Sequence, residues 1–279
     1  MRIWTSLTGV VLGVMVTGCG VGAGDGTPAE SSPVTAPQSA PVTVAYGPAG
    51  SQFGELYLPQ GTGSDASPAV AVLIHGGFWS ATYGLDLMRP LAFDLVARGY
   101  AVWNIEYRRV GEKGGGYPGT LDDVGRAIDE LASLADRYPL DLSRVALVGH
   151  SAGGHLALWA TGRSVQVVAA SVAVGVGPVI DLAGGAQAGL GGGAIVALLG
   201  GTPDEQPKRY LAATPTADVE TPLVVVRGSA DSVVPARFTV PAEGSGNIEV
   251  IDIEGDDHFD LIDPTSSSWA AVIGVLPSP

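Results

Sequence analysis

Residues 145–154 read Val145-Ala146-Leu147-Val148-Gly149-His150-Ser151-Ala152-Gly153-Gly154, an apolar run that leads into a glycine-rich turn around a serine. The apolar run predicts a buried strand, and a helical pattern over Ala152–Ala160, closed by Gly162, follows at once. Gly-x-Ser-x-Gly between a strand and a helix is typical of a nucleophilic serine on a strained turn, since the glycines let strand and helix pack closely. A purely structural glycine-rich turn would not require that context. The segment therefore predicts Ser151 as a nucleophile.

The rest of the chain past residue 42 alternates short strand-like runs with helical patterns, which predicts an α/β fold with a mostly parallel sheet covered by helices on both faces. The expected strands are Val42–Tyr46, Glu55–Leu58, Val70–Ile74, Ala101–Ile105, Val145–Val148, Val167–Val174, Leu223–Val226 and Ile248–Ile253. Helices are expected over Leu85–Arg98 and from Thr120, the expected cap, to Pro139. We interpret the glycine- and alanine-rich residues 175–202 as a short lid or cap insertion.

The amino-terminal residues have the pattern of an export signal. Ile3–Val16 carries no charge and is too short for a comfortable membrane span, as in the core of a signal peptide. Val16-Thr17-Gly18-Cys19 resembles the bacterial lipobox, which implies diacylglycerol on the Cys19 sulfur and cleavage just before it. An ordinary secretory leader with an incidental cysteine is the alternative. We expect residues 1–18 to be a lipoprotein signal peptide and the exported chain to be lipid-anchored on the extracytoplasmic face.

Residues 19–41 follow the lipobox as a lipidated cysteine and a disordered linker rich in Gly, Ala, Ser, Thr and Pro, because so few large apolar side chains cannot form a core. Residues 42–279 remain for one catalytic domain of ordinary size. The chain holds 14 Lys and Arg against 28 Asp and Glu, and the net charge of −14 disfavours nucleic acid and anionic lipid as partners. We therefore expect membrane contact through the lipid anchor only.

Cysteine and metal chemistry are disfavoured in the folded body. Cys19 is the only cysteine, so no intramolecular disulfide, thiolate metal site or catalytic cysteine is available there. Four acids, Asp256, Asp257, Asp260 and Asp263, lie close together in the sequence. They lack the regular spacing and the glycine of a Ca²⁺ loop. We expect neither a metal nor an organic cofactor.

The strand Val70–Ile74 ends in His75-Gly76-Gly77-Phe78-Trp79. This turn resembles that of α/β-hydrolase lipases and esterases, which implies an oxyanion hole built from the amides of Gly77, Phe78 and Ala152. Phe78 stands where many such esterases have a third glycine, so the likeness is to the His-Gly-Gly-x-Trp type, the feruloyl-esterase-like and kynurenine-formamidase-like branches. We expect His75 to support the loop, and Trp79 to pack in it or line the pocket.

Two further stretches, residues 104–108 and 117–124, resemble the Tyr-Arg and Pro-x-x-x-x-Asp-Val segments of the same esterases. We interpret the residues of both stretches as structural. We expect Arg108, beside an acidic helix start, to support the oxyanion loop without touching substrate.

The acid and the base are expected after the last two strands. Gly228-Ser229-Ala230-Asp231-Ser232-Val233-Val234-Pro235 resembles the acid turn of the family, and Asp231 is the only acid between Glu220 and Glu243. His258 lies in the loop after Ile248–Ile253, where the fold places its base, whereas we expect His150 and His155 to serve packing. The order Ser, Asp, His is that of the α/β-hydrolases.

These residues imply a serine hydrolase that cleaves small-molecule carboxylic esters through a Ser151–His258–Asp231 triad and an acyl-enzyme. Formamide hydrolysis of the kynurenine-formamidase kind is an alternative that His-Gly-Gly-x-Trp favours and export disfavours. A prolyl-oligopeptidase-like peptidase is another, although the propeller of those enzymes is missing. A binding protein is a third, and active-site labelling would distinguish it from an enzyme.

Overall fold

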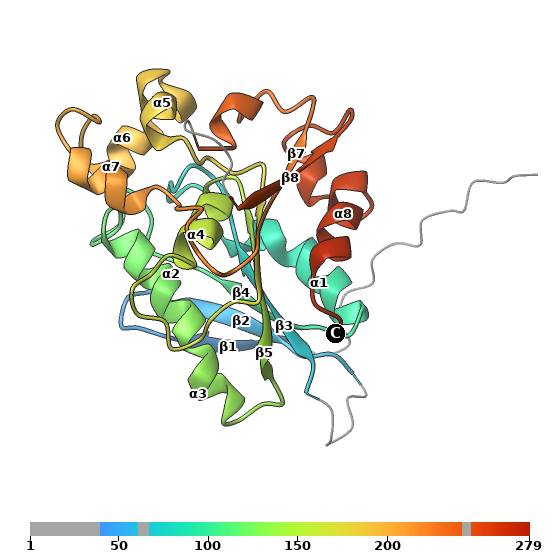
Figure 1. Cartoon of the computed structure of the whole chain (residues 1–279). Coiled ribbons are helices and arrows are strands. Elements are labelled where there is room, and N and C mark those ends of the chain that lie inside the picture. Colours follow the sequence, from blue (N-terminus) through green and yellow to red (C-terminus); the bar gives the residue numbers. More distant parts are fainter. Residues whose placement is uncertain (1–39, 61–66, 242–246) are drawn as a thin grey trace, which may run out of the picture. The chain divides into compact units, whose positions relative to one another are not determined.

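A computed structural model describes residues 40–60, 67–241 and 247–279, which form one eight-stranded sheet in the order β1-β2-β4-β3-β5-β6-β7-β8 (Figure 1). The strands are β1 Val42–Ala45, β2 Phe53–Tyr57, β3 Ala69–Ile74, β4 Ala101–Ile105, β5 Asp141–His150, β6 Val172–Val176, β7 Leu223–Gly228 and β8 Ile248–Ile253. β1, β2 and β4 pair antiparallel, and every pair from β4 to β8 is parallel. The mostly parallel α/β sheet expected from the sequence is confirmed.

Helices cover both faces of this sheet (Figure 1). α1 (Arg89–Ala97) and α8 (Ser267–Val275) lie on one face, and α2 (Gly119–Asp129), α3 (Leu131–Ala135) and α4 (Ala152–Ala160) lie on the other. Side chains of a strand alternate between the faces, so Val70, Val72 and Ile74 join the core under α2 and α4 while Ala71 and Leu73 join the core under α1 and α8. Burial on both faces explains the unbroken apolar runs.

The segment interpreted as an insertion forms short helices between β6 and β7. They are α5 (Leu182–Gln187) and α6 (Ala194–Leu199), which pack against each other, and α7 (Pro207–Ala213) follows beyond the expected segment. A 3-10 turn at Leu190–Gly192 joins α5 to α6. Further 3-10 turns lie at Leu85–Met88, Ala236–Phe238 and Asp260–Ile262. Within the described ranges, no helix is long and apolar enough to cross a membrane.

Two expected boundaries are wrong because side chains compete for the backbone. The strand expected from Val167 begins only at Val172, since the amides of Val167 and Val168 donate to Asp129 Oδ1 at 3.1 and 3.3 Å and are not available to a sheet. Thr120 is not a cap but the second residue of α2. Its hydroxyl donates to the carbonyl oxygen of Arg108 and accepts from a preceding loop amide.

The helix expected up to Pro139 is divided at Glu130 into α2 and α3, although the Glu130 amide still donates to the Arg126 carbonyl at 2.9 Å. Leu85–Arg98 likewise contains a 3-10 turn before α1 begins at Arg89. These breaks shift element ends and leave the layers unchanged.

The packing of the turn at Ser151 can be tested by substituting a glycine that lies beside it and comparing the result with a glycine in another helix. A Cβ at Gly153 in α4 would lie 2.1 Å from the Ile74 carbonyl oxygen, whereas a Cβ at Gly274 in α8 would meet nothing within 4 Å. We expect Gly153→Ala to lower the free energy of unfolding by about 3 kcal/mol or more. Gly274→Ala should raise it by about 0.5–1 kcal/mol, because alanine loses less backbone entropy on folding. Urea denaturation measures both, and equal effects would contradict this packing.

Candidate active site

Ser151 forms the whole turn between β5 and α4, because β5 ends at His150 and α4 begins at Ala152. Its backbone has φ 57° and ψ −119°, a conformation that costs a non-glycine residue about 1–3 kcal/mol. The Ser151 amide donates to the Val176 carbonyl of β6 at 2.8 Å, which fixes the turn against the neighbouring strand. The structure thus places Ser151 at the carboxyl end of the central strand, as expected for a nucleophile.

The expected acid and base lie side by side. His258 Nδ1 is 2.7 Å from Asp231 Oδ2, and both side chains are almost fully buried. The other oxygen, Asp231 Oδ1, accepts from the amides of Val233 and Val234 at 2.9 and 2.8 Å. With Nδ1–H donating to the carboxylate, Nε2 of the neutral ring keeps its lone pair and can accept a proton.

Gly177, which the sequence reasoning missed, lies directly against this pair. It follows β6 with φ +55°, and a Cβ there would lie 3.2 Å from Asp231 Oδ2, 3.3 Å from His258 Nδ1 and 2.8 Å from Leu261 Cδ1. The Gly177 amide donates to the Val226 carbonyl at 2.8 Å, so the turn is held to β7. Glycine satisfies both the backbone conformation and the close approach. A glycine just past a strand is the signal that was available, but many of the 41 glycines share it.

His150, expected to serve packing, also holds the loop that carries His258. Its Nε2–H donates to the backbone carbonyl of His258 at 3.0 Å, and the two rings lie 4.5 Å apart. Burial, together with the smaller effect of the nearby His258 ring, lowers the pKa of His150 to about 3. His150 is therefore neutral at working pH. It acts on the proposed base through one hydrogen bond and ring contact.

The loop after β3 has left-handed backbone conformations at Gly77, Phe78 and Trp79, with φ values of 102°, 52° and 54°. Within the described residues, the amides of Gly77 and Phe78 donate to no other group. Ala152 is the first residue of α4. An amide at this position has no partner inside the helix and lies at the positive end of the helix dipole. All three amides are thus available to an oxyanion. Trp79 is fully buried and packs its ring edge-on against His155.

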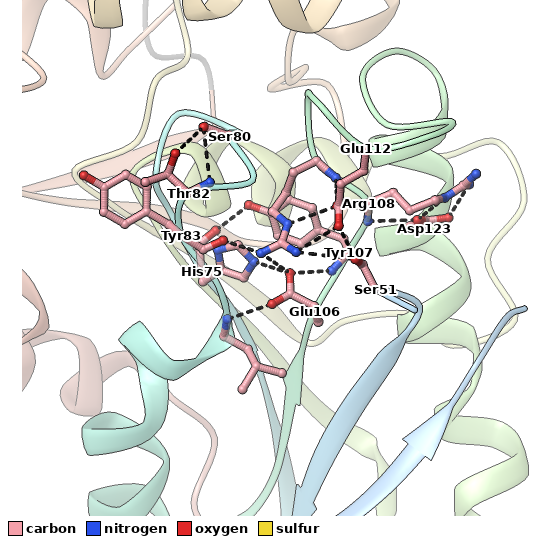
Figure 2. A network of polar contacts seen from close by, with 12 residues as sticks. Ser51, His75, Ser80, Thr82, Tyr83, Glu106, Tyr107, Arg108, Glu112 and Asp123 are labelled. Atoms are coloured by element: carbon pink, nitrogen blue, oxygen red, sulfur yellow. Dashed lines mark hydrogen bonds and ion pairs between the residues drawn. The ribbon is translucent and has the colours of Figure 1, made fainter. Parts of the chain in front are cut away.

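A buried polar network supports this loop (Figure 2). His75 Nε2 lies 2.8 Å from Glu106 Oε1, and its ring stacks on Tyr107 at 4.3 Å. The Tyr107 hydroxyl donates to the His75 carbonyl at 2.8 Å. Arg109 reaches Glu106 Oε1 at 3.2 Å and also donates to the Tyr83 carbonyl. His75 supports the loop as expected, since these contacts hold both ends of residues 75–83.

Arg108 has a different partner from the one expected. Its guanidinium donates twice to the buried Asp123 carboxylate, at 2.7 Å each, and so anchors the start of α2 (Figure 2). Asp123 also accepts from Gln52 at 2.6 Å. The following residue, Arg109, is the arginine that contacts the oxyanion loop.

A pocket of about 210 Å³, here called the serine pocket, brings Ser151 and His258 together with Gly77 and Phe78, while Asp231 lies outside its lining. It is lined by Gly77, Phe78, Tyr83, Leu87, His150, Ser151, Val233, His258 and Phe259. Ala152 is fully buried and is not part of this lining. Among the described residues, no three His, Cys, Asp or Glu side chains are placed to hold a metal ion. The acids near His258 instead fix turns, as Asp257 does by accepting from the amides of Phe259 and Asp260 at 2.8 and 3.0 Å.

The fold and this arrangement define an α/β-hydrolase. Residues 55–241 match the BD-FAE family, and the chain belongs to that family. A curated relative, Hydrolase acrC of Aspergillus aculeatus, is 36% identical over 119 residues, which cover 38% of this chain and only 27% of the relative.

Solved structures of bacterial esterases share the fold. Esterase B of Lactobacillus rhamnosis, determined with a tributyrin phosphonate inhibitor, has a TM-score of 0.68 at 21% identity and covers 86% of this chain and 85% of its own. Est2 of Thermogutta terrifontis with bound butyrate has a TM-score of 0.63 at 19% identity, with 85% of this chain and 91% of its own covered. At these identities the likeness concerns the fold.

His150 and His155 form a matched pair for testing the loop contact. Both are buried in or beside α4, and His155 Nε2 donates to the Ala213 carbonyl at 2.8 Å, away from His258. We expect His150→Leu to lower kcat by roughly 10–100-fold with little change in KM, because the base loop loses its donor. His150→Gln should restore much of kcat, since its amide nitrogen can reach the same carbonyl. Steady-state ester hydrolysis measures this.

His155→Leu is the control for the loss of a buried histidine, and it should cost stability but lower kcat far less than His150→Leu, because its ring contacts Trp79 and not His258. The proton between His258 and Asp231 gives a second readout, because its low-field NMR resonance should shift in His150→Leu and stay in place in His155→Leu. Equal loss of kcat in both leucine variants would reduce His150 to a packing residue.

Proposed function

We propose that the chain hydrolyses carboxylic esters with Ser151 as nucleophile, His258 as base and Asp231 as the acid that orients the base. The observation that carries this proposal is the 2.7 Å contact between His258 Nδ1 and Asp231 Oδ2 beside a serine on a strained turn in the same pocket. The amides of Gly77, Phe78 and Ala152 are proposed as the oxyanion hole.

Acylation follows from the positions of these groups. His258 Nε2 takes the hydroxyl proton as Ser151 Oγ bonds to the ester carbonyl carbon, and the negative charge moves onto the carbonyl oxygen beside the oxyanion amides. The carbon–oxygen bond to the alcohol then breaks, and the same proton passes from His258 to the leaving oxygen. Asp231 stabilises the imidazolium between these steps. The product is free alcohol and acyl-Ser151.

Deacylation repeats the sequence with water. His258 removes a proton from the water as its oxygen bonds to the acyl carbon. The bond to Ser151 Oγ then breaks, the proton returns to the serine, and the carboxylic acid leaves. Every proton is carried by His258, so these residues complete the reaction.

Small esters are the proposed substrate class. The serine pocket is lined by apolar side chains such as Leu87, Val233 and Phe259, with no charged residue besides the proposed base. The butyrate held by Est2 of Thermogutta terrifontis supports the same size class. An assay of p-nitrophenyl esters beside N-formylkynurenine separates this proposal from formamide hydrolysis. We expect turnover of the esters, whereas turnover of N-formylkynurenine would support the formamidase alternative.

Covalent labelling tests the nucleophile. We expect a fluorophosphonate to label the wild type and the surface variant Ser143→Ala equally, and Ser151→Ala not at all, because no other group of the site would form the phosphonyl bond. Ester hydrolysis should fall by about 10⁴-fold or more in Ser151→Ala. Mass spectrometry of the labelled peptide measures the site, and circular dichroism checks the fold. Labelling that persists in Ser151→Ala would refute the assignment.

We also propose that the chain is exported and held at the extracytoplasmic face of a membrane by lipid on Cys19. Residues 1–39 lie outside the described part of the structure, so this proposal rests on the sequence. An uncharged Ile3–Val16 precedes the only cysteine of the chain. Two or three acyl chains give stable anchoring, whereas a net charge of −14 gives no attraction to anionic lipid.

Metabolic labelling with a fatty-acid analogue tests the anchor. The wild type should incorporate the analogue and Cys19→Ser should not, while both hydrolyse esters at the same rate, because the catalytic domain folds without lipid. Labelling is preferred to cell fractionation, since the variant can keep its apolar leader and remain at the membrane by that route. If the wild type incorporates no analogue, the amino-terminal segment is an ordinary export signal and the proposed anchor is wrong.

A further inference from the structure

A second pocket adjoins the serine pocket across the oxyanion loop. It measures about 340 Å³ and lies between that loop and the helical insertion, and we call it the insertion pocket. Its walls include Val110, Ala194, Ala197 and the three glycines 191–193. Gly77, Phe78 and Tyr83 line both pockets, so the two are neighbours on either side of these residues.

We propose that the insertion pocket binds the acyl part of the ester and that the serine pocket receives the alcohol. This inference rests on the proposed function. The insertion pocket would accept an uncharged, largely apolar acyl group of up to about ten non-hydrogen atoms. This size follows from roughly 30 Å³ for each atom, the volume that one water molecule occupies in the liquid.

The proposed proton transfer to the leaving oxygen indicates which part of the ester occupies each pocket. The leaving oxygen must accept its proton from His258, so the alcohol lies on the side of Ser151 that carries His258, Val233 and Phe259. These three line the serine pocket and are not part of the insertion pocket. The carbonyl oxygen points to the oxyanion amides. The acyl carbon is the remaining substituent, and it leads away from His258.

The acyl group would then pass between Phe78 and Tyr83, the side chains common to both pockets. Tyr83 is held by its backbone to Arg109, and its ring points away from the Glu106 network (Figure 2). A Cβ at Gly77 would lie 2.5 Å from the Tyr83 ring. The Tyr83 side chain therefore lies directly against the backbone of Gly77.

Glycines keep the insertion pocket open. A Cβ at Gly191 would lie 2.5 Å from the Phe78 ring, so only glycine lets this segment rest on that ring. At Gly192 and Gly193 nothing lies within 4 Å of the Cβ position, and both face open space. The remaining insertion residues of the wall, Ala194 and Ala197, have short side chains.

The lining also excludes charge. None of the residues that line the insertion pocket is acidic or basic, so a buried carboxylate or ammonium group would lose its hydration without gaining a partner. An acyl chain that ends in a charge, such as a hemisuccinate, is therefore expected to react more slowly than an uncharged acyl chain of equal length.

Two wall variants change the pocket in opposite directions. Ala197 is exposed on α6, and Ala197→Leu narrows the pocket, whereas Val110→Ala widens it. With p-nitrophenol as the common alcohol, Ala197→Leu should lower the ratio of kcat/KM for octanoate over acetate by roughly tenfold or more. Val110→Ala should raise that ratio. Ala212→Leu, an exposed alanine on α7 outside both pockets, is the matched control and should keep it unchanged.

A second series holds the acyl group constant. Among acetates of phenol, naphthol and methanol, Ala197→Leu should keep the wild-type order and ratios of kcat/KM. A changed alcohol preference, or an unchanged acyl preference in an enzyme that the fluorophosphonate still labels, would overturn the pocket assignment alone. A wild type that neither reacts with the fluorophosphonate nor hydrolyses any ester would contradict the proposed function itself.

Discussion

The strained backbone of Ser151 is the constraint on which the site depends. A serine at φ 57° persists because its amide is bonded to Val176 and because the helix that follows packs directly on the end of β3. Gly153 makes that approach possible, and Gly149 leaves room for the Gly153 carbonyl, which would lie 2.0 Å from a Cβ at residue 149. The strain of about 1–3 kcal/mol is thus offset by packing that also points the hydroxyl out of the sheet.

Parallel pairing brings the other groups to this turn. β3, β5, β6, β7 and β8 run in one direction, so the loops after their carboxyl ends meet at one edge of the sheet. These loops supply, in that order, the Gly77 and Phe78 amides, Ser151, Gly177, Asp231 and His258. An antiparallel strand at any of these positions would send its loop to the opposite edge. The topology therefore determines which residues can meet, and the local turns determine their orientation.

The sequence predicted the layers of the fold well, because the apolar runs of β3, β4, β5 and β7 are typical of strands buried on both faces. It failed where a distant side chain decides the outcome. Asp129 takes the amides that would have extended β6, and the Thr120 hydroxyl bonds back to the loop before α2. The roles of His150 and Gly177 depend on how the loops after β6 and β8 pack, which no local pattern encodes.

The charges around the site leave the His258 imidazolium of the proposed reaction with one partner, the Asp231 carboxylate. Burial lowers the pKa of His150 to about 3, so the ring beside His258 stays neutral while an imidazolium forms in the proposed reaction. The positive charge of that imidazolium then faces the Asp231 carboxylate without repulsion from its nearest histidine. Arg109, which is cationic, is paired with Glu106 and Glu112 behind the oxyanion loop. Fixed positive charge therefore supports the shape of the loop, and the pockets stay uncharged around the ester.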